Sequence, residues 1–190
     1  MSWITLQQAQ LAYGHWPLLD KVDFSLNEQE RVGLIGRNGA GKTTTLRAIM
    51  GHLPLVAGTI HFDGQDLSRL PPHARAGLGI GYMPEDDCYI HGLSGIECMQ
   101  VAARLSRMSA TEGLRRGHEI LDFCGTGQER YRPVETYSTG MRQKLRFAMA
   151  IVHDPKLLIL DEPTASVDDI SEEEITKALE REANSGRIVL

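Results

Sequence analysis

One short stretch of the chain has the residue types and the spacing of a phosphate-binding loop. Residues 36–44 read GRNGAGKTT, with Gly36, Gly41, Lys42 and Thr43 at the fixed places of the pattern G-x-x-x-x-G-K-[ST]. Glycines allow successive backbone N–H groups to turn toward phosphate oxygens, and a helix N-terminus behind the loop adds partial positive charge. Lys42 can reach the terminal phosphates, and the Thr43 hydroxyl can ligate Mg²⁺. The stretch therefore predicts a site for a nucleotide and its metal ion.

The segments on either side of the loop fit this interpretation. The apolar run 32–35 predicts a strand before the loop, and a helix-permissive stretch follows it as far as Ile49. A glycine-rich turn that matches the pattern by chance is the alternative, and the strand–loop–helix context disfavours it. The residues expected to contact the nucleotide are Gly36, Arg37, Asn38, Gly39, Ala40, Gly41, Lys42, Thr43 and Thr44.

Two carboxylates stand at the end of a second apolar run. Residues 156–162 read KLLILDE, so that Asp161 and Glu162 follow a predicted buried strand. In open α/β sheets this C-terminal edge is where ligands bind. Paired acids could merely cap the next turn, but with a phosphate loop upstream we predict a catalytic role. Asp161 would hold Mg²⁺ through water, and Glu162 would polarise the attacking water.

Length and composition indicate an ordinary globular protein. The chain has 190 residues, enough for one substantial domain or two closely packed lobes, and its net charge of −5 argues against broad nucleic-acid binding. The three cysteines show no metal-binding spacing, which indicates reduced thiols in a cytosolic protein. No signal peptide is evident, and no apolar run approaches the ~20 residues that cross a bilayer. Any membrane role must then depend on a partner.

The first part of the chain is dominated by strand patterns. The expected elements are antiparallel strands at 3–11 and 22–26 around a turn at 14–17, a strand at 58–62 with a turn at 63–64, a short helix from Pro71-Pro72 to Ala76, and a buried strand that ends at Met83.

Between Pro84 and Pro155 the pattern becomes helical. The expected helices run from a capping box of Ser94 and Glu97 to about Met108, from a cap at Thr111 to about Cys124, and from Gly140 to His153; a last helix opens with a box of Ser171 and Glu174 and ends near 184–186, before a strand at 187–190.

Three cations on the third of these helices admit two interpretations. For Arg142, Lys144 and Arg146 a solvated basic face is the default, and contact with a phosphate or a partner is the alternative.

The segment between the two predicted strand ends carries a family resemblance. Residues 137–144 read YSTGMRQK, which resembles the signature sequence of ATP-binding cassette (ABC) ATPases, usually L-S-G-G-Q. After the acid pair, residues 163–168 look like the D-loop of that family. The order of phosphate loop, signature, acid strand and D-loop is jointly specific, and the resemblance covers the whole chain.

The resemblance implies a fold and its division into lobes. It implies an α/β fold with a P-loop NTPase (RecA-like) core, a small antiparallel β subdomain and an inserted α-helical subdomain. Residues 1–83 and 154–190 would form the nucleotide-binding lobe, and residues 84–153 the helical lobe that carries the signature.

It also implies roles for particular residues. Tyr13 would stack on adenine, although a tyrosine in a loop is by itself more often a packing residue. Ser138 and Gly140 would contact the γ-phosphate of an ATP held by a second copy, because in this family two subunits close head to tail around two ATP molecules. ATP and Mg²⁺ are the implied cofactors, and an integral membrane permease is the implied partner.

The chain departs from the family pattern at three places. The signature has Tyr137, Thr139 and Met141 where Leu, Gly and Gln are usual. The Q-loop glutamine is replaced by Glu85, whose carboxylate can still approach Mg²⁺ and take part in catalysis but lacks an amide donor. The switch histidine of the family would follow residues 187–190, where the sequence ends. We therefore expect a chain that binds MgATP and hydrolyses it poorly.

Different segments resemble different branches of the family. The opening through Lys42 resembles soluble ABC proteins that act on translation, residues 52–86 resemble branched-chain amino-acid importer ATPases, and residues 138–168 resemble exporter ATPases. The favoured function is the ATP-hydrolysing subunit of a transporter, cytoplasmic and peripheral on the inner face of the cell membrane, with no nucleic-acid partner. A translation protein is the alternative, but such proteins normally carry two cassettes and a basic linker. A P-loop kinase or GTPase would need a different acid motif.

Overall fold

The computed structural model describes residues 2–27, 30, 32–35, 37, 39–165, 167–185 and 187–190, without the side chains of Ser2, Tyr13, Ser171, Ala183 and Ile188. Along the described chain the elements are β1 (Ser2–Tyr13), β2 (Trp16–Asn27), α1 (Lys42–Ile49), β3 (Ala57–Phe62), β4 (Gln65–Asp66), α2 (Pro72–Ala76), β5 (Ile80–Met83), α3 (Gly95–Leu105), α4 (Ala110–Phe123), the 3-10 turns η1 (Gly127–Tyr131) and η2 (Val134–Thr136), α5 (Thr139–Ile151), β6 (Leu157–Leu160), α6 (Asp169–Asn184) and β7 (Ile188–Val189).

The first sheet is antiparallel, in the order β2-β1-β3-β4. Leu6 on β1 stands opposite Phe24 of β2 and Ile60 of β3, and its buried side chain belongs to the same hydrophobic cluster as Leu46 and Ile49 of α1. The predicted strands are confirmed, but the first hairpin is tighter than expected. Trp16 and Pro17, which the sequence assigned to the turn, belong to β2, so the chain reverses over Gly14 and His15.

The second sheet is parallel, in the order β5-β6-β7. Gly81 pairs with Leu158, which pairs in turn with Val189. The strand predicted at 32–35 is wrong: no strand is assigned there, and the Ile35 side chain is 99% exposed. Backbone bonds from Val32 N to Val189 O (3.0 Å) and from Val189 N to Glu30 O place only the start of this segment beside β7. Because β7 is two residues long, it offers no pairing edge to the rest.

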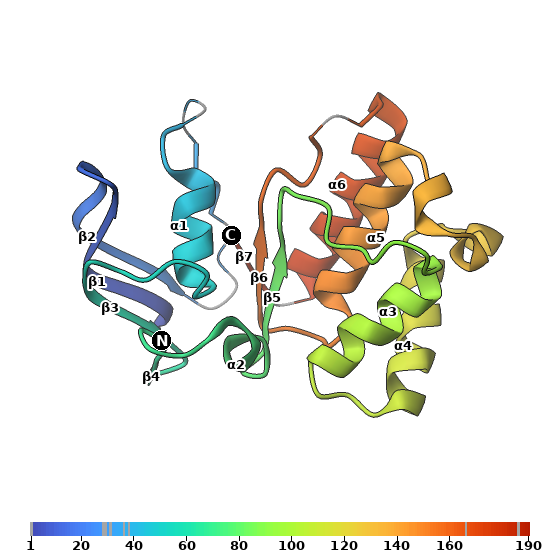
Figure 1. The fold of residues 1–190 in the computed structure, drawn as a ribbon, viewed down its shortest axis with the longest axis horizontal. Helices are drawn as coiled ribbons and strands as arrows, with labels where there is room; N and C mark the ends of the chain where they lie inside the picture. The colour runs from blue at the N-terminus through green and yellow to red at the C-terminus, as the bar shows by residue number, and fades with distance from the viewer. Residues whose placement is uncertain are drawn as a thin grey trace.

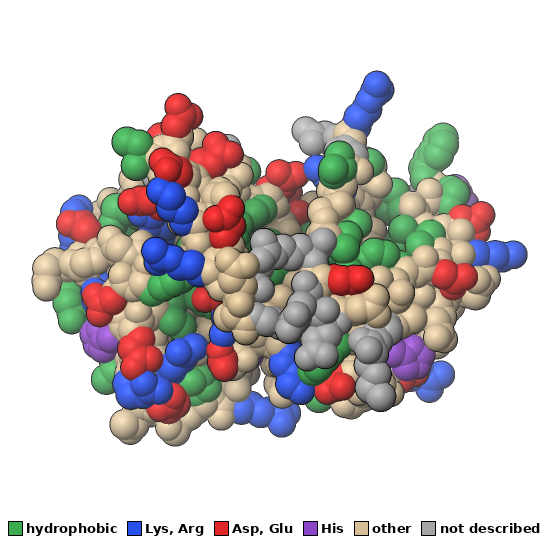
Figure 2. All heavy atoms as spheres, turned by 180° about the vertical axis from the view of Figure 1, so that it is seen from behind, with side chains coloured by type: hydrophobic (Ala, Val, Ile, Leu, Met, Phe, Trp, Pro, Cys, Tyr) green, Lys and Arg blue, Asp and Glu red, His purple; other side chains and the backbone are tan. Residues whose placement is uncertain are grey.

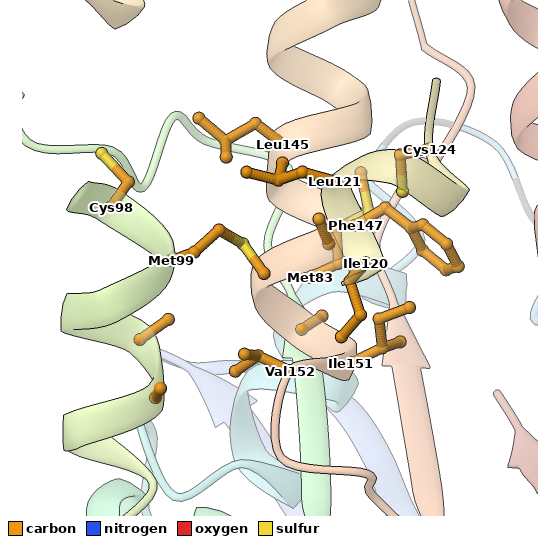
Figure 3. Packing of buried hydrophobic residues seen from close by; sticks show 14 of the residues in the cluster. Met83, Cys98, Met99, Ile120, Leu121, Cys124, Leu145, Phe147, Ile151 and Val152 are labelled. Carbon is orange, nitrogen blue, oxygen red and sulfur yellow. The ribbon is translucent and has the colours of Figure 1, made fainter. Parts of the chain in front are cut away.

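Helices α3, α4 and α5 enclose one of the two hydrophobic cores of the described chain (Figure 3); the other lies between the antiparallel sheet and α1. Leu145 and Phe147 of α5 are buried against Met99 of α3 and Leu121 of α4. Met83 and Leu158 from the parallel sheet belong to the same cluster, so that α5 packs on both the helices and the sheet. One face of α5 is thereby fixed in place.

Two of the predicted helix starts need correction. The capping box at Ser94 is confirmed, since Ser94 N donates to a carboxylate oxygen of Glu97 at 2.7 Å. The next helix is capped by Ser109, which accepts from Glu112 N, and not by Thr111, because Ser109 stands three residues before a glutamate. Helix α6 begins at Asp169, so Ser171 lies in its first turn and not at its cap, although its side chain is outside the described residues.

The parallel sheet lies between the two remaining parts of the molecule (Figure 1). The antiparallel sheet and α1 lie on one side of it, and α3 to α6 lie on the other. On the face seen in Figure 2, acidic and basic side chains are interspersed over the described surface. Among the helices described, none combines the length and the apolar character needed to cross a membrane.

Candidate functional site

The phosphate loop and the acid pair meet where α1 begins and β6 ends. Gly41 precedes α1 with a φ of +86°, a left-handed conformation that suits glycine. A Cβ on Gly41 would lie 3.4 Å from the Leu18 side chain of β2, so the start of α1 is seated against the antiparallel sheet. On the other side, Asp161 N donates to Met83 O at 2.9 Å, which holds the end of β6 beside β5.

Lys42 and Glu162 form an ion pair across this junction. Lys42 Nζ lies 2.9 Å from Glu162 Oε1, although the two residues are 120 positions apart in the sequence. The hydrogen bond to Glu162 is the main cause of a raised pKa of Lys42, and nearby acidic charges add to it. Glu162 has a φ of +50°, which a non-glycine residue adopts only when its surroundings hold it there. Both side chains remain partly exposed, so the pair is accessible to a ligand.

Thr43 and Asp161 form the second contact between the two motifs. Thr43 Oγ1 donates to Asp161 Oδ1 at 3.0 Å. The other oxygen, Asp161 Oδ2, is buried and has no hydrogen-bond partner among the described residues, while Asp161 as a whole is 3% exposed. Burial raises the pKa of Asp161, the Thr43 hydrogen bond opposes this shift, and the charge of Glu85 adds to it. A buried oxygen without a partner is costly unless a ligand or water completes it.

These two side chains suit Mg²⁺ held together with a nucleotide. No group of three or more acidic, histidine or cysteine side chains in the described part of the chain could hold a metal ion by itself. Mg²⁺ commonly takes only one or two protein oxygens and completes its octahedron with phosphates and water. The hydroxyl of Thr43 and the unpartnered oxygen of Asp161 fit that donor set.

A cavity of about 770 Å³ opens over this junction. The loop residues that line it are Gly39, Gly41, Lys42, Thr43 and Thr44, and from across the cavity Glu85 and Glu162 line it too. The structure therefore brings together five of the expected loop residues with Glu85 and Glu162, the two carboxylates that line this cavity.

Other expected site residues lie apart from the cavity or outside the described part. Arg37 and Ala40 form a turn in which Ala40 N donates to Arg37 O at 3.0 Å. Ser138 is exposed and Gly140 buried at the start of α5, and neither lines the cavity. Gly36, Asn38 and the Tyr13 side chain are outside the described residues.

The sequence reasoning missed several residues of this region. Trp16, which was assigned to a turn, lines the cavity with 78% of its surface exposed. Arg146 was interpreted as part of a solvated face, but it is 7% exposed. Gln143 is 1% exposed and was not singled out at all. An exposed aromatic residue in a hairpin was a possible signal for Trp16, whereas the helical period alone does not distinguish Arg146 from its neighbours.

The comparisons with known proteins agree with this geometry. The family model described as ABC transporter matches residues 19–165, most of the chain. The chain belongs to the ABC transporter family.

Several curated relatives extend the match. The lipopolysaccharide export system ATP-binding protein LptB of Escherichia coli K12 is 35% identical over 100% of this chain and 79% of its own length. LptB of Haemophilus influenzae is 32% identical with the same coverage. YhcH of Bacillus subtilis, an uncharacterized ABC transporter ATP-binding protein, is 37% identical over 90% of this chain and 56% of its own length.

Solved structures match the fold. A nucleotide-free ATP-binding cassette from an ABC transporter superposes with a TM-score of 0.87 at 20% identity, over 100% of this chain and 80% of that one. An ATP-binding subunit of an ABC transporter superposes with a TM-score of 0.85 at 27% identity, over 99% and 78%. The predicted fold class is confirmed: a P-loop NTPase core with an antiparallel sheet subdomain and helices.

The expected function is confirmed at the level of the family. The chain is an ATP-binding subunit of the ABC transporter type, a family whose members hydrolyse ATP to power transport. Nothing in the comparisons supports the alternative of a protein that acts on translation.

The buried carboxylate of Asp161, which suits Mg²⁺, is predicted to lower the stability of the protein when no ligand is bound. The folded-state pKa of Asp161 lies above its unfolded value, so the folded state binds the proton more tightly. The free energy of unfolding therefore falls as the pH rises from the unfolded-state pKa through the folded-state pKa. We expect Asp161→Asn to raise the melting temperature of the protein without Mg²⁺ and nucleotide by a few degrees at pH 7, and by less at pH 4. Differential scanning fluorimetry at both pH values measures this. Equal or lower stability of the variant at pH 7 would contradict it.

Proposed function

We propose that the chain binds MgATP in the cavity over α1 and β6 and hydrolyses it to drive a separate membrane permease. The observation that supports this most strongly is the contact of Lys42 and Thr43 with Glu162 and Asp161. The two hydrogen bonds join residues 120 and 118 positions apart. A lysine, a hydroxyl and two carboxylates gathered at one junction are the groups that nucleotide hydrolysis requires.

The proposed steps of ATP hydrolysis follow from the hydrogen bonds that these side chains make. In the proposal, the terminal phosphates compete with Glu162 for the Lys42 ammonium, because they present more negative charge. Glu162 is then free to orient and polarise a water molecule, and Glu85 lies across the same cavity. Thr43 and Asp161 would hold the Mg²⁺ ion that accompanies the nucleotide. The ion, when bound, neutralises charge that develops on the phosphate oxygens.

A second copy is proposed to complete the site. Ser138 caps α5 by accepting from Met141 N at 3.2 Å, so the start of this helix presents its hydroxyl and backbone N–H groups to solvent. Neither Ser138 nor Gly140 lines the cavity of its own chain. In a head-to-tail dimer they would face the γ-phosphate held by the other copy, as the family resemblance implies.

The permease is proposed to dock in a groove beside the helical lobe. We propose residues 84–153 as that lobe, because α3, α4 and α5, which share one hydrophobic core, all lie within this span. A largely apolar groove of about 630 Å³ lies between α3 and the end of α1, with Leu105 and Met50 on its two sides. Leu105 is 70% exposed. A partner seated there would hold the protein at the inner face of the membrane.

Loss of Lys42 tests nucleotide binding. The chain has two tryptophans, and Trp16 lines the cavity, so we expect ATP to change its fluorescence. Lys42→Ala should weaken ATP binding ~10- to 100-fold, since it removes a charge-assisted hydrogen bond to phosphate. Fluorescence titration measures this, and Lys21→Ala on the exposed part of β2 is the matched control.

The source of the signal is tested separately. Trp3 packs on Phe62 with ring centroids 5.9 Å apart, away from the cavity, so Trp3→Phe should keep the response and Trp16→Phe should remove it. Unchanged ATP affinity in Lys42→Ala would refute the proposed site.

A charge in the groove tests the docking proposal. Leu105→Glu should reduce copurification with a coexpressed membrane permease at least ~10-fold, because a carboxylate would be buried in an apolar contact. Leu114→Glu changes another exposed leucine of the helical lobe that does not line the groove. Equal copurification of both variants would place the permease elsewhere.

A further inference from the structure

Helix α5 carries two buried polar side chains that stand one turn apart. Gln143 is 1% exposed and Arg146 is 7% exposed, and Arg146 Nη2 donates to Gln143 Oε1. Neighbouring residues of the same helix, Leu145 and Phe147, belong to the hydrophobic core shown in Figure 3. The helix that carries the polar pair is therefore firmly packed.

One end of this pair holds the backbone that follows the acid strand. Gln143 Nε2 donates to Glu162 O at 3.0 Å and to Pro163 O at 2.6 Å. Glu162 is the residue with a φ of +50°, a conformation that its surroundings must maintain. The Gln143 amide is a direct restraint on that conformation.

The other end holds the backbone beside the groove. Arg146 Nη1 donates to Pro84 O at 3.2 Å and also to Glu85 O. Arg146 and Pro84 line the groove, while the Glu85 side chain lines the cavity over Lys42. The pair thus connects the wall of the groove with the residue that we propose to activate water.

These contacts are costly to break one at a time. A buried guanidinium needs acceptors, and the acceptors recorded for Arg146 are two carbonyls and the Gln143 amide oxygen. A carbonyl that loses its buried donor costs more than the net value of the bond. Displacement of the Glu162 backbone is therefore transmitted to the Glu85 backbone more readily than it is absorbed between them.

We propose that Gln143 and Arg146 are positioning residues, which form a buried hydrogen-bonded link between the groove and Glu162, so that a change at either place shifts the other. The inference rests on the proposed function, because it takes ATP as the ligand of the cavity. By linkage, the factor by which ATP changes the affinity of the groove for its occupant equals the factor by which that occupant changes the affinity of the cavity for ATP.

Cys88 offers a probe of the groove that needs no permease. Its side chain lines the groove, and burial raises the pKa of its thiol to about 11, so alkylation at neutral pH is slow and depends on local opening. Cys98 and Cys124 are buried in the helical core and serve as internal references. Peptide mass spectrometry resolves the alkylation rate of each thiol.

The experiment compares alkylation of Cys88 by N-ethylmaleimide with and without MgATP. We expect MgATP to change the rate at least about fivefold in the unmodified protein, and less than about twofold in Gln143→Leu and Arg146→Met. Arg146→Lys retains a donor for the groove backbone and should recover part of the response. Lys144→Met is the matched control, since it removes a cation of the same helix that pairs with Glu174.

The outcomes separate this proposal from the proposed function. If the unmodified protein fails to bind ATP by Trp16 fluorescence, the proposed function is wrong. If it binds ATP but Cys88 does not respond, or if Gln143→Leu and Arg146→Met still bind ATP and respond like the unmodified protein, the link is refuted. If Gln143→Leu does not fold, the response of Cys88 to MgATP is measured in Gln143→Glu instead. This variant keeps the acceptor for Arg146 and loses the amide donor to Glu162.

Discussion

The rest of the structure depends on one junction, at which the start of α1 meets the end of β6. Lys42 and Thr43 contact Glu162 and Asp161 there, and the contacts require that α1 begins and β6 ends at the same edge of the molecule. Strand β6 lies between β5 and β7, so its buried position fixes the acid pair. The antiparallel sheet fixes the other partner, because Leu18 packs against Gly41.

Helix α5 relates this junction to the rest of the molecule. Its N-cap residue Ser138 is exposed to solvent, its middle holds Gln143 and Arg146 inside, and its hydrophobic face packs in the core. One rigid element thus carries the proposed contact with a second copy, the restraint on Glu162 and one wall of the groove. In an arrangement of this kind, binding at one surface can change the binding affinity at another without a large movement of the helix itself.

The sequence predicted the elements and the motifs well where local chemistry decides them. The continuous apolar run 157–160 identified β6, and the Ser94 box identified the start of α3. It failed where a distant neighbour decides: the run 32–35 has strand composition, but only its first residue bonds to the short strand β7. Arg146 looks like a surface cation by composition, and the carbonyls that accept from its buried guanidinium belong to Pro84 and Glu85, 62 and 61 positions away.

The central claim is that the cavity over α1 and β6 is half of an ATP site, completed by Ser138 and Gly140 of a second copy. Sedimentation velocity of Glu162→Gln at saturating MgATP tests it most directly, since this variant should bind ATP without hydrolysing it. The account predicts that the mass rises from 21.1 kDa to about twice that value, and that adding Ser138→Arg prevents the rise. A monomer that nevertheless shows saturated Trp16 fluorescence would contradict it.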